Sequence, residues 1–240
     1  PMDTLLQQIV NGLVVGSVYA LVALGYTMVY GILGLINFAH GEVLMVGALT
    51  ALQIILWLMG VAPDMAPLLM LSIAVAVAMP VCMGLGYLME RLAYRRLRNA
   101  PRLAPLITAI GMSFLLQTLA MIIWGRGNHS FPQLISTEPI ALVGTVVITP
   151  VQIAIIVISA LMMGGLLVLV NRSRMGRAMR ATAENHKVAQ LMGVDTNGVI
   201  ALTFILGAGM AAVAGVMIAS NYGIANNSTV LSPIEAAASV

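Results

Sequence analysis

The stretch GLINFAHGEVLMVGALTALQIILWLMGVAP, residues 34–63, carries the pattern that decides the fold. From residue 43 to residue 63 it contains no charged side chain, and neither does the stretch from residue 4 to residue 39. An α-helix needs about 20 consecutive apolar residues to cross a bilayer. Both uncharged stretches are long enough, so they predict membrane-spanning helices. The polar residues Asn37, His40 and Glu42 between them mark either a helix boundary or a functional site.

The composition of the whole chain indicates the same environment. Of its 240 residues 60% are hydrophobic and 8% are charged, whereas about a quarter of the residues in a typical soluble domain are charged. All 11 Lys and Arg residues except Arg126 lie in two short runs, residues 91–102 and 172–187. Such runs are typical of cytoplasmic loops, because Lys and Arg near the ends of spans resist translocation. A nucleic-acid-binding protein would instead spread basic residues over a folded face. We therefore expect a chain that is embedded in the lipid bilayer and binds no nucleic acid.

The apolar segments predict one transmembrane domain over residues 1–240. A closed β-barrel would need alternating strands of about ten residues, and no predicted span alternates in that way. The fold class that we expect is therefore all-α, a polytopic helical bundle. The basic runs place the loop at residues 125–150 outside and the corner at residues 34–42 toward the inside. The predicted spans are residues 5–30, 41–60, 67–89, 104–124, 151–170 and 198–219.

The first apolar region is the least regular of these segments. Residues 5–36 are too many for one upright span and too few for two, and Gly25, Gly31 and Gly34 are able to break a helix. The N-terminal segment has no Lys or Arg. This favours one crossing followed by an irregular or re-entrant segment, with the N-terminus outside.

Small residues recur at every fourth position in two of the predicted spans. One series is Gly12, Gly16 and Ala20; the other is Gly207, Ala211, Gly215 and Ala219. Such series let helix backbones approach closely. We expect them to pack within the bundle, with a subunit interface as the alternative.

Motifs for common catalytic sites are missing from the sequence. A phosphate-binding P-loop ends in Gly-Lys-Ser/Thr, but the only lysine, Lys187, lies between His186 and Val188. The three histidines are far apart, and no His-Glu-x-x-His motif for zinc occurs. We therefore expect no enzyme activity, no catalytic residue and no metal site in this chain.

The second basic run forms a bounded unit between two spans. Residues Arg177–Met192 are good helix formers without proline, Gly176 precedes them, and Gly193 follows at a position that suits a C-terminal cap. A short cytoplasmic amphipathic helix is expected here. It would present two sets of side chains: Arg180, Glu184 and Lys187, spaced to pair on one face, and Ala181, Val188 and Met192 along another. Three roles are open: lying on anionic lipid, connecting two spans, or docking into a groove on a cytoplasmic partner.

Two segments resemble a known family. They are MVYGILGLINFAHGEVLMVGA, residues 28–48, and SRMGRAMRATAENHKVAQLMGVDTNGVIALTFILGAGMAAVAGVM, residues 173–217. Together they are similar to the permease of bacterial high-affinity branched-chain amino-acid ABC transporters, the LivH type. The resemblance covers most of residues 5–223 and implies a multi-pass inner-membrane permease. It also implies a second, related permease subunit, two cytoplasmic ATPases that bind the ATP, and a periplasmic substrate-binding protein. The helix at residues 177–192 would then couple the permease to an ATPase.

The polar corner has two interpretations. In the first, Asn37 caps the helix that follows and Glu42 in its first turn interacts with the positive end of the helix dipole. In the second, His40 pairs with Glu42 or gates a polar passage, because ionisable groups at membrane depth are costly and usually functional. Asn37, His40 and Glu42 are therefore our candidates for the substrate pathway or an inner gate.

Other functions are also compatible with the sequence. An ion-coupled secondary transporter would carry charged residues in the middle of its spans, whereas Glu42 and Glu90 fall near predicted span ends. A purely structural subunit and an ABC permease for amides or urea remain as alternatives. Residues 226–240 follow the family pattern poorly, and we expect the C-terminal part of the family domain to be missing from this sequence.

Overall fold

This computed structural model describes residues 2–34, 36–97, 100–101, 103–134, 138, 140–143 and 146–226. Six of its helical segments are long and apolar enough to cross a membrane, which confirms the all-α, polytopic bundle. The helices are α1 (Met2–Leu33), α2 (His40–Val61), α3 (Pro67–Met89), the π-helical turn η1 (Glu90–Tyr94), α4 (Arg95–Leu97), α5 (Leu103–Trp124), α6 (Pro150–Arg172), α7 (Arg174–Glu184), α8 (His186–Leu191) and α9 (Thr196–Tyr222). The short strands are β1 (Asn128–Ser130), β2 (Ile140–Val143), β3 (Val146–Ile148) and β4 (Ile224–Asn226).

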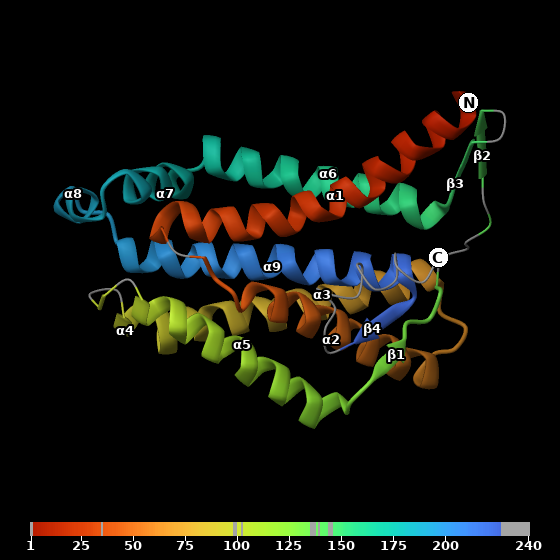
Figure 1. Cartoon of the computed structure of the whole chain (residues 1–240), viewed down its shortest axis with the longest axis horizontal. Helices are drawn as coiled ribbons and strands as arrows, with labels where there is room; N and C mark the ends of the chain where they lie inside the picture. Colours follow the sequence, from red (N-terminus) through yellow and green to blue (C-terminus); the bar gives the residue numbers. More distant parts are fainter. Residues whose placement is uncertain are drawn as a thin grey trace.

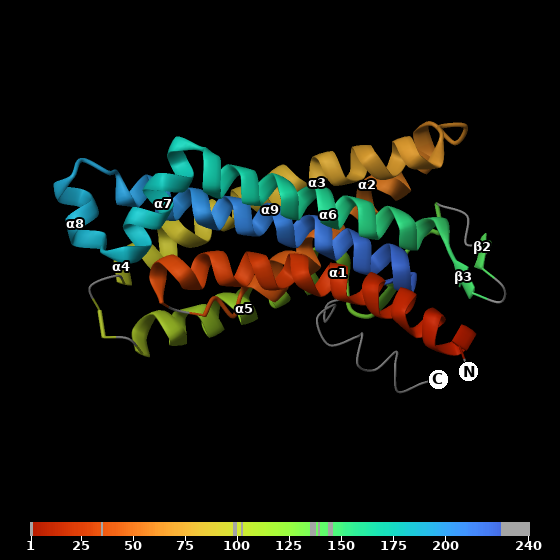
Figure 2. The same cartoon turned by 90° about the horizontal axis from the view of Figure 1, so that it is seen from above.

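Helix α9 is the centre of the bundle. It packs against α1, α2 and α3, and its side chains are buried along most of its length. Figures 1 and 2 show α6 and α5 on opposite sides of this core. Both outer helices bury only a few of their apolar side chains and leave the others partly or fully exposed. In a bilayer these faces meet lipid tails or another subunit.

The two ends of the bundle differ in charge. Helices α4, α7 and α8 lie together at one end, and the N-terminus and the β2–β3 hairpin lie at the other (Figure 1). The chain therefore brings its two basic runs to the same end, as expected if both face the cytoplasm. The antiparallel pair β1–β4 joins the segments that follow α5 and α9.

Helix α1 is continuous through two of the three glycines that are able to break a helix. Gly25 and Gly31 are helical, and only Gly34, with a φ of 65°, ends the regular segment. No break occurs at Gly25, where the glycine serves packing instead: its missing side chain leaves room for the ring of His40 and for the backbone of Gly207.

After Gly34 the chain turns back into the bundle before α2 begins (Figure 1). The ring of His40, the first residue of α2, lies against Gly25 and contacts the ring of Tyr26 with centroids 4.4 Å apart. Leu33, at the end of α1, is eight residues beyond Gly25, which is about 12 Å along the helix axis. Helix α2 therefore begins inside the bundle. The corner is re-entrant, as one of the expected arrangements had it, but it reaches deeper than the end of a span.

The two small-residue series behave differently. Gly207 and Gly215 of α9 lie against the backbones of Gly25 and Leu44, so this series packs within the bundle as expected. Nothing of the described chain lies near the open positions beside Gly12 and Gly16. Their face of α1 points outward instead of packing inside this chain.

Candidate functional site

The re-entrant corner and the basic end of the bundle hold the residues that the sequence singled out. At the corner, Asn37 is not the helix cap that one of our two interpretations predicted. The N-cap of α2 is Ala39, without a side-chain hydrogen bond. The side-chain oxygen of Asn37 instead accepts hydrogen bonds from the Ala39 backbone N–H (3.2 Å) and from the Tyr94 hydroxyl (2.8 Å). Asn37 thus ties the re-entrant segment to the π-helical turn η1.

The turn η1 was not recognised from the sequence. Tyr94 is buried there, and its ring packs on Phe204 of α9 with centroids 5.0 Å apart. Glu90 in the same turn is fully buried and accepts two hydrogen bonds from the guanidinium of Arg95, at 3.3 and 3.1 Å. The five-residue spacing of Glu90 and Arg95 fits a π-helical turn rather than the i, i+4 spacing of an α-helix. That spacing was the signal in the sequence.

His40 faces α1. It is 2% exposed, and its Nε2 has no hydrogen-bond partner among the described residues. The expected pairing of His40 with Glu42 does not occur, because two residues that are two positions apart point to different sides of a helix. His40 instead fills the space that Gly25 leaves beside Tyr26.

Glu42 faces α5. Its side chain is 9% exposed, and its Oε1 accepts hydrogen bonds from the Ser113 hydroxyl (2.9 Å) and the Gln117 amide (2.8 Å). Ser113 and Gln117 lie in the middle of α5, so Glu42 is at membrane depth, although the sequence placed it near a span end. We did not identify Ser113 and Gln117 as a pair from the sequence. Their i, i+4 spacing within an apolar span indicates that both polar side chains lie on one face of the helix.

The predicted amphipathic helix at residues 177–192 is two helices. Asn185 is extended, with φ −154° and ψ 107°, and separates α7 from α8. Its side-chain oxygen accepts the backbone N–H groups of Lys187 and Val188, so Asn185 caps α8. The single-helix prediction was wrong because Asn is a poor helix-interior residue and a strong N-cap.

The ends of this segment also differ in part from expectation. Ser173 caps α7, so Gly176 lies inside the helix and packs against the backbone of Val170. Gly193 follows α8 with a φ of 83°, as predicted for a C-terminal cap position.

The expected charge pairing on this segment does not form. The Arg180 guanidinium donates to the backbone carbonyl of Val170. No ion pair links Arg180, Glu184 and Lys187 in the part of the chain that the structure describes. The break at Asn185 puts Glu184 and Lys187 on different helices. Their side chains therefore do not lie one turn apart on a common helix face.

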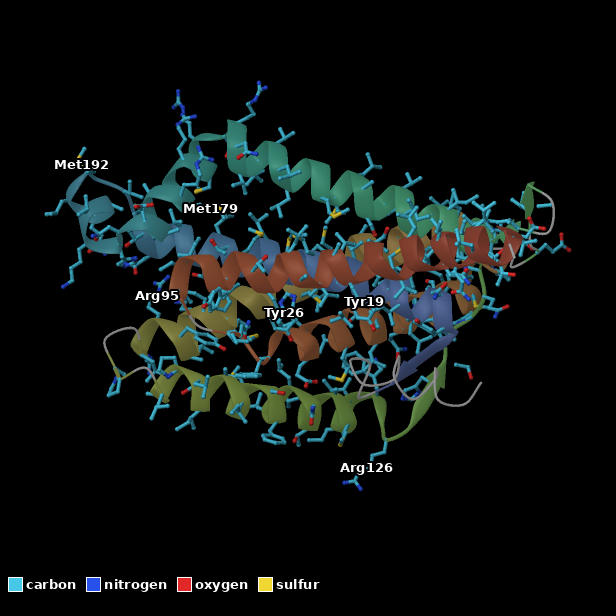
Figure 3. The ribbon with its side chains drawn as sticks, turned by 45° about the horizontal axis from the view of Figure 1, so that its top comes forward. Tyr19, Tyr26, Arg95, Arg126, Met179 and Met192 are labelled. Carbon is cyan, nitrogen blue, oxygen red and sulfur yellow. The ribbon has the colours of Figure 1, made fainter. Side chains whose placement is uncertain are left out.

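Apolar side chains gather on the outside of α8. Val188 is 51% exposed, Met192 directly after the helix is 79% exposed, and Leu191 is exposed as well. Ala181, which we expected on the same face, belongs to α7 and is also exposed. In Figure 3, Met192 lies at the outer tip of the bundle, whereas Met179 of α7 lies nearer to the transmembrane helices. Met179 is buried. We call Val188, Leu191 and Met192 the α8 edge. The edge is an apolar surface that nothing in the described chain covers.

Comparison with known proteins identifies relatives over most of the chain. A family model described as the permease component of branched-chain amino acid transport systems matches residues 8–240. The chain is 48% identical over 224 residues to the high-affinity branched-chain amino acid transport system permease protein BraD of Pseudomonas aeruginosa, which covers 92% of this chain and 73% of BraD. It is 46% identical over 226 residues to LivH of Escherichia coli K12, covering 92% of this chain and 72% of LivH. A probable branched-chain amino acid transport permease of Methanocaldococcus jannaschii is 27% identical over 205 residues, covering 85% of this chain and 63% of that protein. No solved structure was found to match.

Proposed function

Because the chain belongs to the family of permease components of branched-chain amino acid transport systems, we propose that it carries branched-chain amino acids through the membrane as a subunit of an ATP-binding cassette importer. The observation that carries this proposal is the identity of 48% over 92% of the chain to a permease protein of a high-affinity branched-chain amino acid transport system. The six membrane-spanning-length helices make it a multi-pass membrane protein. We assign it to the bacterial inner membrane on the basis of its bacterial relatives.

A permease component works with other components of its transport system. We propose a second, homologous permease subunit, two cytoplasmic ATPases and a periplasmic substrate-binding protein. ATP binds to the ATPase chains, and this chain binds no cofactor and performs no hydrolysis itself. The absence of a P-loop motif from the sequence supports that division of labour.

The α8 edge is our candidate contact with an ATPase. It lies at the basic end of the bundle, it is apolar, and it is exposed. An exposed apolar edge on a short helix between two spans fits docking into a groove of a partner. The basic residues of the neighbouring helix α7, Arg174, Arg177 and Arg180, are exposed and would interact with acidic rims of that groove or with lipid headgroups.

The re-entrant corner is our candidate for the inner gate. Asn37 contacts η1, His40 contacts α1, and Glu42 contacts α5. Three separate helices therefore contact one short segment, so a shift of that segment would change its contacts with all three. Irregular backbone at membrane depth is found where it is buried in protein or lines a cavity, which supports a role in the pathway.

Co-purification tests the assembly. A tagged copy of the chain, solubilised from its own membrane, is expected to bring down a second permease and two ATPases. ATP hydrolysis by that complex should rise when the binding protein loaded with leucine is added. If no ATPase accompanies the chain, or if an amide- or urea-loaded binding protein stimulates hydrolysis and the leucine-loaded protein does not, the proposed importer or its substrate is wrong.

A further inference from the structure

Glu42 is a carboxylate at membrane depth, and its hydrogen bonds within the described chain involve only one of its two oxygens. Both hydrogen bonds, from Ser113 and from Gln117, end on Oε1. Oε2 has no hydrogen bond in the described chain, and it is not among the fully buried unpartnered atoms. No Lys, Arg or His side chain forms an ion pair with Glu42 in that part of the chain. One oxygen of the carboxylate is therefore held and the other is open.

The donors on Oε1 orient the carboxylate but do not neutralise it. Ser113 and Gln117 are uncharged, and both belong to α5, whereas Glu42 belongs to α2. Hydrogen bonds to a charged carboxylate are stronger than bonds between neutral groups, so the pair fixes the direction in which Oε2 points. A carboxylate that is oriented in this way, with no cation beside it in the described chain, offers Oε2 to a positively charged group.

Apolar side chains flank Ser113 and Gln117 on α5. Ile110 and Phe114 lie three residues before Ser113 and Gln117, respectively, so the four side chains form one stripe of the helix. Ile110 is 40% exposed and Phe114 is 65% exposed. A ligand at Oε2 would therefore place a positive group on Glu42 and apolar groups along α5.

We propose that Glu42 binds the α-ammonium group of the amino acid in transit, while its branched side chain lies along the stripe of Ile110 and Phe114. This inference rests on the proposed function, because it assigns part of that pathway. An α-ammonium group is common to leucine, isoleucine and valine, so the contact selects amino acids as a class and leaves their apolar side chains to the stripe. Ser113 and Gln117 act as positioning residues.

Replacement of Glu42 by Gln separates this role from a structural one. The amide oxygen of the new side chain is able to accept from Ser113 and Gln117 as Oε1 does, so the α2–α5 contact is kept and only the charge is lost. Leucine uptake is measured in vesicles that contain both permeases and both ATPases, with saturating binding protein. We expect uptake to fall about tenfold or more, the loss that corresponds to one hydrogen bond between charged groups. Binding-protein-stimulated ATP hydrolysis should persist, so more ATP is consumed per leucine transported.

Asp64→Asn is the matched control. Asp64 is an exposed carboxylate in the turn between α2 and α3, and its loss should leave uptake unchanged. Normal uptake by Glu42→Gln would overturn the inference. Parallel loss of subunit assembly, ATP hydrolysis and uptake would also overturn it, because that result assigns Glu42 to the fold. If the unaltered complex itself fails to transport leucine with ATP, that result overturns the proposed function, and with it this inference.

A second measurement asks which group of the ligand Glu42 holds. The solubilised complex without binding protein is titrated with leucine, with isoamylamine, which lacks the carboxylate, and with isocaproate, which lacks the ammonium group. We expect leucine and isoamylamine to bind to the unaltered complex and to lose binding in Glu42→Gln. Binding of isocaproate in place of isoamylamine, or no binding of leucine to the unaltered complex, would contradict an ammonium site at Glu42.

Discussion

At the scale of single residues, the contact between Gly25 and His40 fixes the depth at which α2 begins. A Cβ atom added at Gly25 would lie 2.5 Å from His40 Cε1, closer than side-chain atoms approach. Since the ring of His40 is buried against Gly25 and Tyr26 of α1, it has little room to move. The size of one residue in α1 therefore controls the position of the re-entrant corner.

Gly25→Val should destabilise the protein. Overpacking a tight contact costs about 1–3 kcal/mol, and the shift of His40 should also reduce uptake. Thermal unfolding in detergent measures the first effect and vesicle uptake the second. Gly16→Ala is the control, because nothing lies near its open position, and its unfolding temperature should not fall. Equal effects of the two substitutions would show that the contact at Gly25 is unimportant.

Tyr94→Phe tests the bond between η1 and the corner. The change removes the hydroxyl that donates to Asn37 and keeps the ring on Phe204. A buried hydrogen bond contributes about 1 kcal/mol, so the free energy of unfolding should drop by about that amount. Tyr30→Phe, on an exposed side chain of α1, should leave it unchanged. A Tyr94→Phe variant as stable as the unaltered protein would contradict the link.

At the scale of elements, the α7–α8 pair separates anchoring from docking. Helix α7 is anchored to the bundle by the close packing of Gly176, by buried Met179 and by the hydrogen bond from Arg180 to Val170. Helix α8 is turned outward by the extended Asn185 and exposes its edge. A change on the edge is therefore expected to affect a partner without unfolding the permease.

Val188→Asp combined with Met192→Asp should release the ATPase. Two exposed apolar side chains buried in an interface contribute a few kcal/mol, and two carboxylates in their place would oppose docking. Pull-down of the ATPases on the tagged permease measures the effect. Val188→Ile with Met192→Leu keeps the edge apolar and serves as the control.

Two results would refute docking at the α8 edge. One is stoichiometric co-purification and normal transport by the double Asp variant. The other is loss of binding to anionic vesicles with intact ATPase association, which would assign the edge to the lipid surface.

At the scale of the whole molecule, we expect the two ends of the bundle to face different compartments. Arg95 and Arg180 belong to elements at one end, and β1, which contains Ser130, lies toward the other (Figure 1). Cys substitutions at the three positions can be labelled from outside intact cells, because the one native thiol, Cys82, is buried. Cys at 130 should react, and Cys at 95 and at 180 should not. The opposite pattern would invert the topology.

The sequence predicted the parts of this fold that follow from local composition. The lengths of the apolar segments predicted the spans. The two basic runs predicted which loops lie at the same end of the bundle. The depth of the corner was not predictable in that way, because it depends on a contact between His40 and Gly25 that is made only in the folded bundle. The partners of Glu42 are likewise distant in the chain, and only their spacing on α5 hinted at them. The break at Asn185 was readable from its capping preference, but the helix-forming residues around it outweighed that signal in our prediction.

ATP-dependent leucine uptake by reconstituted vesicles tests the central claim most directly. The vesicles contain this chain with its co-purifying permease and ATPases, ATP is enclosed on the ATPase side, and leucine-loaded binding protein is added on the other. The account predicts leucine accumulation that requires ATP, the ATPases and the binding protein together, and that an imposed proton or sodium gradient does not replace. Accumulation driven by such a gradient without ATP would identify an ion-coupled transporter. No accumulation with all components present would contradict a role for this chain in branched-chain amino acid import.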